Sequence, residues 1–299
     1  MSKSAKGIYL AFITALISGF SIFLNKYAVG IISPPLYFTA IKNAVVAVLI
    51  LIVVLNGKKL SSLKTLSRRD LLLLISVGVI GGSIPFYLFF TGLSQVSSVN
   101  AAIIQKMMIV WVALLAGPVL KEKLTRIQFS AVAILFLSNF VIGGFKGFTF
   151  STGELMIFAS TLFWAVEYML AKKVLKNVDP DVVVLFRMGI GSILLLGATF
   201  FTSSAKNVKL DSQSLFWFTL SVGLLFGYVI SWYRALKFTK ATTVVSILVA
   251  STLVTNVLSA IFVTKTITPE IAVQTLLIIA GSALFYTASK REKTSLAEY

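Results

Sequence analysis

Long apolar stretches recur along the whole chain, separated by short segments rich in charged residues, glycine or proline. A helix needs about 20 apolar residues to cross a hydrocarbon core about 30 Å thick. The breaks in the pattern therefore predict ten membrane-spanning helices. They cover residues 7–29, 35–55, 70–92, 99–119, 127–145, 153–173, 181–202, 215–236, 242–263 and 269–288. We expect an all-α polytopic membrane protein.

The composition supports this class and removes others. Of the 299 residues, 58% are hydrophobic and 12% are charged, so little chain is left for a soluble catalytic domain. The sequence contains neither His nor Cys, which excludes imidazole bases, thiol nucleophiles and disulfides. Paired catalytic carboxylates and metal-ligand spacings are absent from it as well. We therefore expect no enzyme activity, no cofactor and no metal site.

The net charge of +17 is distributed by loop and does not form one basic surface. On one side of the predicted membrane, basic residues lie in segments 3–6, 58–69, 121–126, 172–176, 234–240 and 290–293. On the other side lie only Lys146, Lys206, Lys209 and Lys265. This asymmetry follows the positive-inside rule and predicts that both termini are cytoplasmic, in a plasma or inner membrane. It leaves no basic face for nucleic acid.

The apolar stretch at the N-terminus is too long for a signal peptide and has no small-residue cleavage site, so we expect it to be retained as the first span.

A repeat links the two halves of the chain. The pattern Ser-Val-Gly-x-x-x-Gly occurs at 76–82 and again at 221–227, and a similar offset pairs Lys42 with Arg187. The copies lie in the third and eighth predicted spans, and an offset of five spans, an odd number of membrane crossings, gives them opposite orientations. We expect two inverted five-helix repeats, residues 1–147 and 148–299, joined by a linker at 143–153. Such repeats are typical of secondary transporters that work by alternating access at a central cavity.

Several segments together resemble the EamA-like branch of the drug/metabolite transporter superfamily. They are 17–26 with its partner 162–173, and 98–106 running on to the acidic turn at 120–125. The resemblance covers nearly the whole chain and implies ten helices, metabolite transport and efflux. Two departures leave the substrate open. Ser18 stands where the family often has Trp, and Lys265 stands where the second repeat would carry the counterpart of Glu122.

Ionisable residues deep inside the predicted spans are the main candidates for a site, because each costs at least about 2.5 kcal/mol in a bilayer. Glu167 and Arg187 share a depth, so they form either a structural ion pair or a protonatable coupling group with its counter-ion. Lys42 and Lys106 have no carboxylate left to pair with. Three cations against one anion favour a substrate with an anionic group; the alternative is that the lysine stems reach outward to water.

Neutral residues near these charges complete the candidate binding site. Asn43 and Gln105 are amides next to lysines, suited to orienting a polar group or to bridging helices. Trp164 and Tyr168 fall at i and i+4 beside Glu167, where they contact either a substrate or neighbouring helices.

Small residues and a proline suggest where the helices touch and bend. We interpret Gly78, Gly82, Gly223 and Gly227 as packing positions rather than ligand contacts. Pro85 is expected to kink the third span near mid-membrane, as a hinge.

The sequence thus predicts a secondary active transporter that exports small polar metabolites such as amino acids or organic acids. Sugar phosphates or nucleotide sugars are the alternative cargo. A non-transporting membrane scaffold or receptor remains a second class. The expected partners are a small-molecule substrate and the lipid bilayer; the coupling ion and the oligomeric state are left open.

Overall fold

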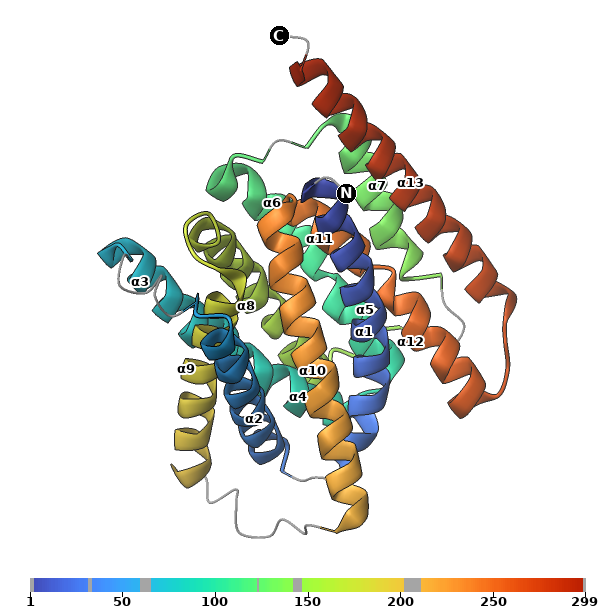
Figure 1. Ribbon diagram of the computed structural model, residues 1–299. Coiled ribbons are helices and arrows are strands. Elements are labelled where there is room, and N and C mark those ends of the chain that lie inside the picture. Colours follow the sequence, from blue (N-terminus) through green and yellow to red (C-terminus); the bar gives the residue numbers. More distant parts are fainter. Residues whose placement is uncertain are drawn as a thin grey trace.

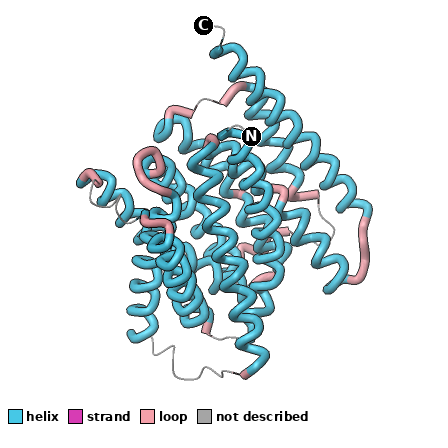
Figure 2. Tube along the Cα trace, in the orientation of Figure 1, coloured by secondary structure: helices cyan, strands magenta, loops and turns pink. Residues whose placement is uncertain are grey.

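A computed structural model describes residues 3–31, 34–59, 66–122, 124–141, 147–201 and 211–297, with side chains as far as residue 288. These segments consist of helices and connecting loops (Figure 2). Part of the expected linker, residues 143–146, lies outside the described residues. So do five of the basic residues used above, namely Lys64, Lys123, Lys146, Lys206 and Lys209.

The helices account for every predicted span. In chain order they are α1 (Lys3–Ile31), α2 (Pro35–Asn56), α3 (Arg68–Ser76), η2 (Val77–Gly81), α4 (Ile84–Gln95), α5 (Ser98–Lys106), α6 (Met108–Leu120), α7 (Arg126–Ser138), α8 (Thr152–Val174), α9 (Pro180–Phe201), α10 (Ser212–Phe238), α11 (Ala241–Leu248), α12 (Ser251–Ser259), η3 (Ala260–Thr264) and α13 (Pro269–Ala297). Within the described ranges, nine helical stretches are long and apolar enough to cross a membrane, and α7 is a shorter apolar helix. The all-α polytopic class is confirmed.

The helix starts follow from local sequence. The hydroxyls of Ser67, Ser97 and Ser151 accept the N–H groups of residues three positions later, at 3.0, 3.1 and 3.4 Å. Thr125 and Gln128 form a reciprocal capping box at the start of α7. Each hydrogen bond satisfies an N–H group that the first helical turn leaves free.

The helices pair mainly between the two halves of the chain. α1 packs against α10, α2 against α9, and α4 against α8, while α7 and α13 form a pair at one side of the bundle (Figure 1). The repeat offset relates α1 to α8 and α4 to α10, so the first and third of these pairs correspond to each other. The start of α1 and the end of α13 lie at the same end of the bundle (Figure 1). This arrangement is the one expected for two related five-helix halves; their boundary at 147/148 stays a prediction.

Two lysines repeat the same contact in both halves. Lys26 Nζ, near the end of α1, donates to the Leu93 carbonyl and to the next carbonyl of α4, both at 3.0 Å. Lys172 Nζ, near the end of α8, donates to the carbonyls of Leu236 and Thr239 at the end of α10. A cation at a helix C-terminus satisfies free carbonyls and complements the helix dipole. The first span of each half therefore holds the end of the third.

Two of the predicted continuous helices are broken, which corrects the sequence analysis. The fourth span divides at Met107, whose N–H donates to the Ile104 carbonyl at 3.0 Å, three residues back. The ninth span divides at Val249 and Ala250, and the Ala250 N–H donates to the Ile247 carbonyl at 3.0 Å. The breaks lie close to one repeat offset apart. Neither contains glycine or proline, so the sequence carried no signal for them.

The third span is broken as well, at the place the sequence analysis assigned to Pro85. The π-helical turn η2 ends at Gly81, and α4 restarts at Ile84 with Pro85 in its first turn. Proline is well tolerated there, because the first N–H groups of a helix have no intrahelical partner. The span therefore bends ahead of Pro85, through the turn at Gly82 and Ser83.

Glu122 fixes a contact between the halves. Its carboxylate accepts the N–H groups of Ala241 and Thr242 at 3.0 and 3.3 Å and the Thr242 hydroxyl at 3.1 Å. It thus caps α11, a helix of the second half. A carboxylate at a helix N-terminus stabilises the positive end of the dipole.

The packing glycines differ between the two halves. A Cβ at Gly82 would lie 2.0 Å from the Arg187 carbonyl oxygen, and one at Gly78 would lie 2.7 Å from a side-chain carbon of α9. At Gly227 the nearest contact would be 3.3 Å, and at Gly223 no atom lies within 4 Å. The expectation of a packing role at Gly223 is therefore not matched by its surroundings. Only the first copy of the motif requires backbone contact.

This difference generates a paired prediction. Gly82→Ala should lower the free energy of unfolding by about 2–3 kcal/mol, because the new methyl group has to displace the α9 backbone. Gly223→Ala should be neutral or stabilising by about 0.5 kcal/mol, since alanine favours the helix and meets no neighbour. Thermal unfolding of both variants in detergent measures the contrast; equal effects would contradict it.

Candidate functional site

A cavity lies between the two halves at the middle of the bundle. About 470 Å³ there, including the mouth, is not occupied by protein atoms. Its lining comes from six helices and consists of Ser18, Ser21, Ile22, Phe86, Phe89, Phe90, Gln105, Trp164, Tyr168, Arg187, Leu225 and Tyr228. Four of the predicted site residues are in this lining: Gln105, Trp164, Tyr168 and Arg187.

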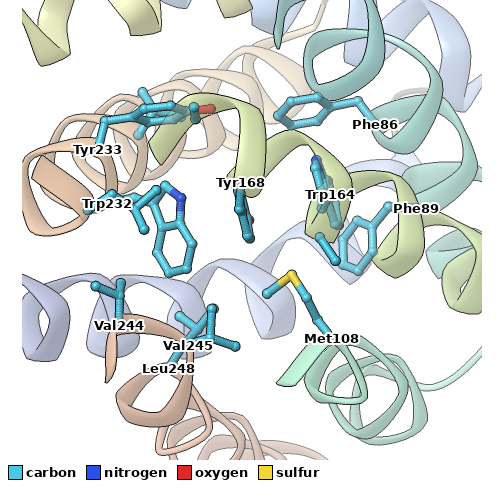
Figure 3. Close-up of a cluster of buried hydrophobic side chains, with 14 of the residues drawn as sticks. Phe86, Phe89, Met108, Trp164, Tyr168, Trp232, Tyr233, Val244, Val245 and Leu248 are labelled. Carbon is cyan, nitrogen blue, oxygen red and sulfur yellow. The ribbon is translucent and has the colours of Figure 1, made fainter. Parts of the chain in front are cut away.

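Aromatic rings form much of the cavity wall. Trp164 contacts Phe86 and Phe89, with ring centroids 5.6 and 5.4 Å apart, and its indole N–H donates to the Gly81 carbonyl at 3.3 Å. Tyr168 packs on Trp232 at 4.5 Å (Figure 3). The predicted pair on one face of α8 therefore takes part in packing and borders the cavity as well. Such rings offer flat apolar surfaces to a ligand.

Arg187 and Glu167 meet beside the cavity, with 3.6 Å between Nε and Oε2. Both side chains are buried. The Tyr233 hydroxyl donates to Glu167 Oε1, and the Arg187 guanidinium lies over the Phe86 ring at 4.9 Å. Among the described residues, Arg187 Nε and Glu167 Oε2 have no hydrogen-bond partner. The ion pair is thus loose, and it leaves Arg187 able to accept a further anionic partner from the cavity.

The backbone of the third span touches both members of this pair. A Cβ at Gly81 would lie 2.1 Å from Glu167 Cγ, and Gly82 contacts the Arg187 backbone as described above. Two adjacent glycines therefore allow the close approach of η2 to α8 and α9.

Lys106 lies at the end of α5, next to the break in the fourth span. Its Nζ donates to Gln105 Oε1 at 2.5 Å and to Ser18 Oγ at 3.4 Å. Both acceptors line the cavity, whereas Lys106 itself stands one layer behind. The described residues provide no carboxylate within ion-pair distance of its ammonium group. Its charge is therefore balanced only by neutral oxygen atoms.

Lys42 is fully buried, and its Nζ has no hydrogen-bond acceptor among the described residues. It lies over the rings of Phe90 and Phe38, 3.4 and 4.5 Å from their centroids. Such cation–π contacts offset about 0.5–2 kcal/mol of the free energy that burial of the ammonium group costs. Phe90 lines the cavity, but Lys42 does not. The structure thus separates Lys42 from the cavity surface by one aromatic ring.

Asn43 is also behind the lining. Its Nδ2 donates to the Gly82 carbonyl at 3.3 Å, while Oδ1 has no partner among the described residues. This contact ties α2 to the bend of the third span.

The repeat explains why Lys42 is unpaired. Lys42 matches Arg187, but the offset that relates Lys26 to Lys172 places Ser21 opposite Glu167. The first half therefore keeps the cation and carries a neutral hydroxyl where the second half has the carboxylate.

A cluster of buried side chains from α10 and α11 lies beside Tyr168 (Figure 3). Trp232, Tyr233, Val244, Val245 and Leu248 pack together and are buried (Figure 3).

An ion network lies at the end of the bundle that carries the basic segments 58–69, 121–126, 172–176 and 234–240, here called the basic end. Asp181, at the start of α9, pairs with Lys59 at 2.5 Å and with Arg234 at 2.9 Å. Burial lowers the pKa of Lys59, but its hydrogen bonds to Asp181 and Asp179 outweigh this and raise the pKa above its ordinary value.

Sequence reasoning missed most of the apolar lining and the polar contact of Tyr233. Phenylalanine and leucine inside an apolar span carry no pattern that separates lining from packing. Ser18 and Ser21 were the available signal, because hydroxyls on one side of a first span are unusual for a lipid-facing surface. Within the described residues, no group of three or more carboxylates could hold a metal ion.

Comparison with known proteins agrees with this architecture. The sequence profile of the EamA-like transporter family matches residues 5–144 and again residues 151–287. A solved crystal structure aligns with a TM-score of 0.78 over 96% of this chain and 98% of that one; at 16% identity it shows the fold alone.

Two similar proteins are named as uncharacterized transporters. One, YyaM of Bacillus subtilis, is 29% identical over 238 residues, which span 74% of this chain and 76% of that protein. The other, from Methanothermobacter thermautotrophicus, is 25% identical over 151 residues, 48% of this chain and 44% of that protein. The profile covers most of the sequence in two successive matches, so the chain belongs to the EamA-like transporter family, within the drug/metabolite transporter superfamily.

Proposed function

We propose that this membrane protein is a secondary active transporter of small polar metabolites that carry an anionic group, with amino acids and organic acids as the first candidates. The observation that carries the proposal is Arg187, which lines a central cavity and whose pairing with Glu167 is loose, with Nε 3.6 Å from Oε2 and no hydrogen bond to Nε within the described structure. Buried cations that lack full compensation are costly unless a ligand supplies the missing charge.

The cavity combines both kinds of surface that such a substrate needs. Its polar groups converge from Arg187, Gln105 and the α1 hydroxyls, and its remaining wall is largely aromatic. A carboxylate can pair with Arg187 while the rest of the molecule packs on Trp164 and Tyr168. Lys106 adds positive potential from behind Gln105, and Lys42 adds it from behind Phe90.

Alternating access is supported by the pairing of equivalent helices across the cavity and by the interrupted spans. Broken helices next to a central site are typical of transporters built from inverted repeats. Rocking of one half against the other needs compliant elements, and the breaks at Met107, at Ala250 and ahead of Pro85 provide them.

Efflux and a plasma or inner membrane location follow from the family resemblance and the charge distribution. The positive-inside asymmetry supports cytoplasmic termini. Protease accessibility of a terminal tag in intact and permeabilised cells tests this placement.

Sugar phosphates or nucleotide sugars are the alternative cargo, because the same cation excess would bind phosphate. A scaffold or receptor would be expected to have its interior sealed by apolar packing, which the cavity beside Arg187 argues against.

Removing the two unpaired lysines should impair transport of anionic substrates. The double variant Lys42→Met/Lys106→Met keeps side-chain volume and should lower the flux of labelled amino acids or organic acids into proteoliposomes about tenfold or more, because the cavity loses the positive potential of two nearby cations. Lys3→Met/Arg126→Met removes the same charge from exposed positions and should transport normally. Equal flux in wild type and the buried double variant would refute the anion-binding proposal.

Pro85→Ala tests the hinge. Alanine fits the first turn of α4, so the amount of folded protein should not change, whereas the transport rate should change about threefold, because the helix that follows the bend loses the fixed φ of its first turn. Pro118→Ala, in α6 and away from this bend, is the matched control. Unchanged kinetics for Pro85→Ala would dismiss the hinge.

The ion pair of Arg187 and Glu167 can be tested as a unit. Arg187→Leu alone should cost about 3–5 kcal/mol of stability, because it leaves a buried carboxylate without its counter-ion. Adding Glu167→Leu should recover most of that loss, but it should not restore flux, because the double variant lacks both the proposed substrate-binding arginine and the proposed coupling carboxylate. Thermal unfolding and flux of the single and double variants separate the two roles, since a purely structural pair predicts recovery of both.

A further inference from the structure

A second hollow opens at the basic end of the bundle, apart from the central cavity. It lies between the start of α3 and the ends of α6 and α8, and encloses about 1020 Å³ including its mouth. Its walls are formed by Ser67, Arg69, Asp70, Leu73, Val119, Leu120, Lys121, Lys173, Lys176 and Asn177. It joins the halves, because α3 and α6 belong to the first and α8 to the second.

The hollow carries four cations and one carboxylate. Asp70 is already occupied: both of its oxygens accept from Asn177 Nδ2 at 3.2 Å, and the Ser67 hydroxyl donates to it at 2.8 Å. Within the described part of the chain, no carboxylate lies within ion-pair distance of Arg69, Lys121, Lys173 or Lys176. A concave surface with several unneutralised cations concentrates anions.

The acidic residue next to Lys121 in the sequence makes its hydrogen bonds outside the hollow. Glu122 directly follows Lys121, but its carboxylate is engaged by the first turn of α11. Lys121 has a backbone φ of 59°, in the left-handed region that glycine or asparagine usually occupies at the end of a helix. The chain thus keeps a cation here at a conformational cost, and nothing in the described surroundings neutralises it.

Part of the wall of the hollow is apolar. Leu73, near the start of α3, and Val119 and Leu120, at the end of α6, share the lining with the basic residues. Cations beside apolar side chains suit a phosphate group that is attached to hydrocarbon. Basic pockets between helix ends on the cytoplasmic side bind anionic phospholipid headgroups in membrane proteins.

We propose that this hollow is a binding site for a phosphate group, supplied by an anionic phospholipid headgroup or by a soluble phosphate. The ligand contacts Lys121 of the first half and Lys173 and Lys176 of the second, so it bridges the two halves at their basic end. The site is separate from the central cavity and does not depend on the transported substrate.

The test uses the purified full-length protein after delipidation. Native mass spectrometry with equal amounts of phosphatidylglycerol and phosphatidylcholine measures lipid retention, and thermal unfolding against inorganic phosphate at constant ionic strength measures free anion binding. Lys173→Gln/Lys176→Gln should lower the binding affinity for the ligand about 25-fold, since each surface cation contributes about fivefold to affinity. Lys3→Gln/Arg126→Gln removes the same charge outside the hollow and should bind as wild type does.

The variant Lys121→Gly is the control for loss of binding through misfolding. Glycine suits the left-handed backbone, so this variant should be at least as stable as wild type while binding the ligand about fivefold more weakly. Retention of phosphatidylglycerol without a response to inorganic phosphate identifies the lipid as the source; a response to both identifies a general phosphate site. The proposal is overturned if wild type binds neither probe, or if hollow and control variants bind alike.

Discussion

A charge inside a bilayer must be paired, hydrogen-bonded or held for a ligand, and four such charges of this protein gather around one cavity. Only Arg187 and Glu167 form an ion pair, at 3.6 Å. Lys106 relies on neutral oxygens, and Lys42 relies on two aromatic rings. The helices that bring these residues together come from both halves of the chain. The energetic demand of these charges therefore explains both where the halves meet and why the space between them contains polar groups.

The number and class of the spans could be predicted from the sequence, because the length of an apolar segment is a direct consequence of bilayer thickness. The breaks at Met107 and Ala250 could not. A helix interrupted by surrounding packing, without glycine or proline, leaves no local trace. Pro85 shows the converse case: the bend was predicted, but it is made at the residues ahead of the proline, where α4 begins.

The charged residues of the candidate site could be predicted from the sequence, but which of the predicted residues line the cavity could not. Depth along a helix could be counted, so Glu167 and Arg187 were placed together. Which side of a helix faces the cavity depends on rotation and on neighbours, so Lys42 and Asn43 turned out to stand behind the lining rather than in it. Equivalent positions also diverge: Ser21 replaces the acid in the first half, and Gly223 lacks the contact that Gly82 makes. A repeat constrains the backbone more tightly than it constrains side-chain roles.

The close approach of Gly81 and Gly82 to α8 and α9 has a mechanical consequence. Their backbone rests directly on the residues of the ion pair, with no intervening side chain to absorb movement. Any sliding of the third span must therefore alter the separation of Glu167 and Arg187 or what surrounds them. Movement of the third span is therefore coupled to the ion pair through two glycines, which make this contact with main-chain atoms alone.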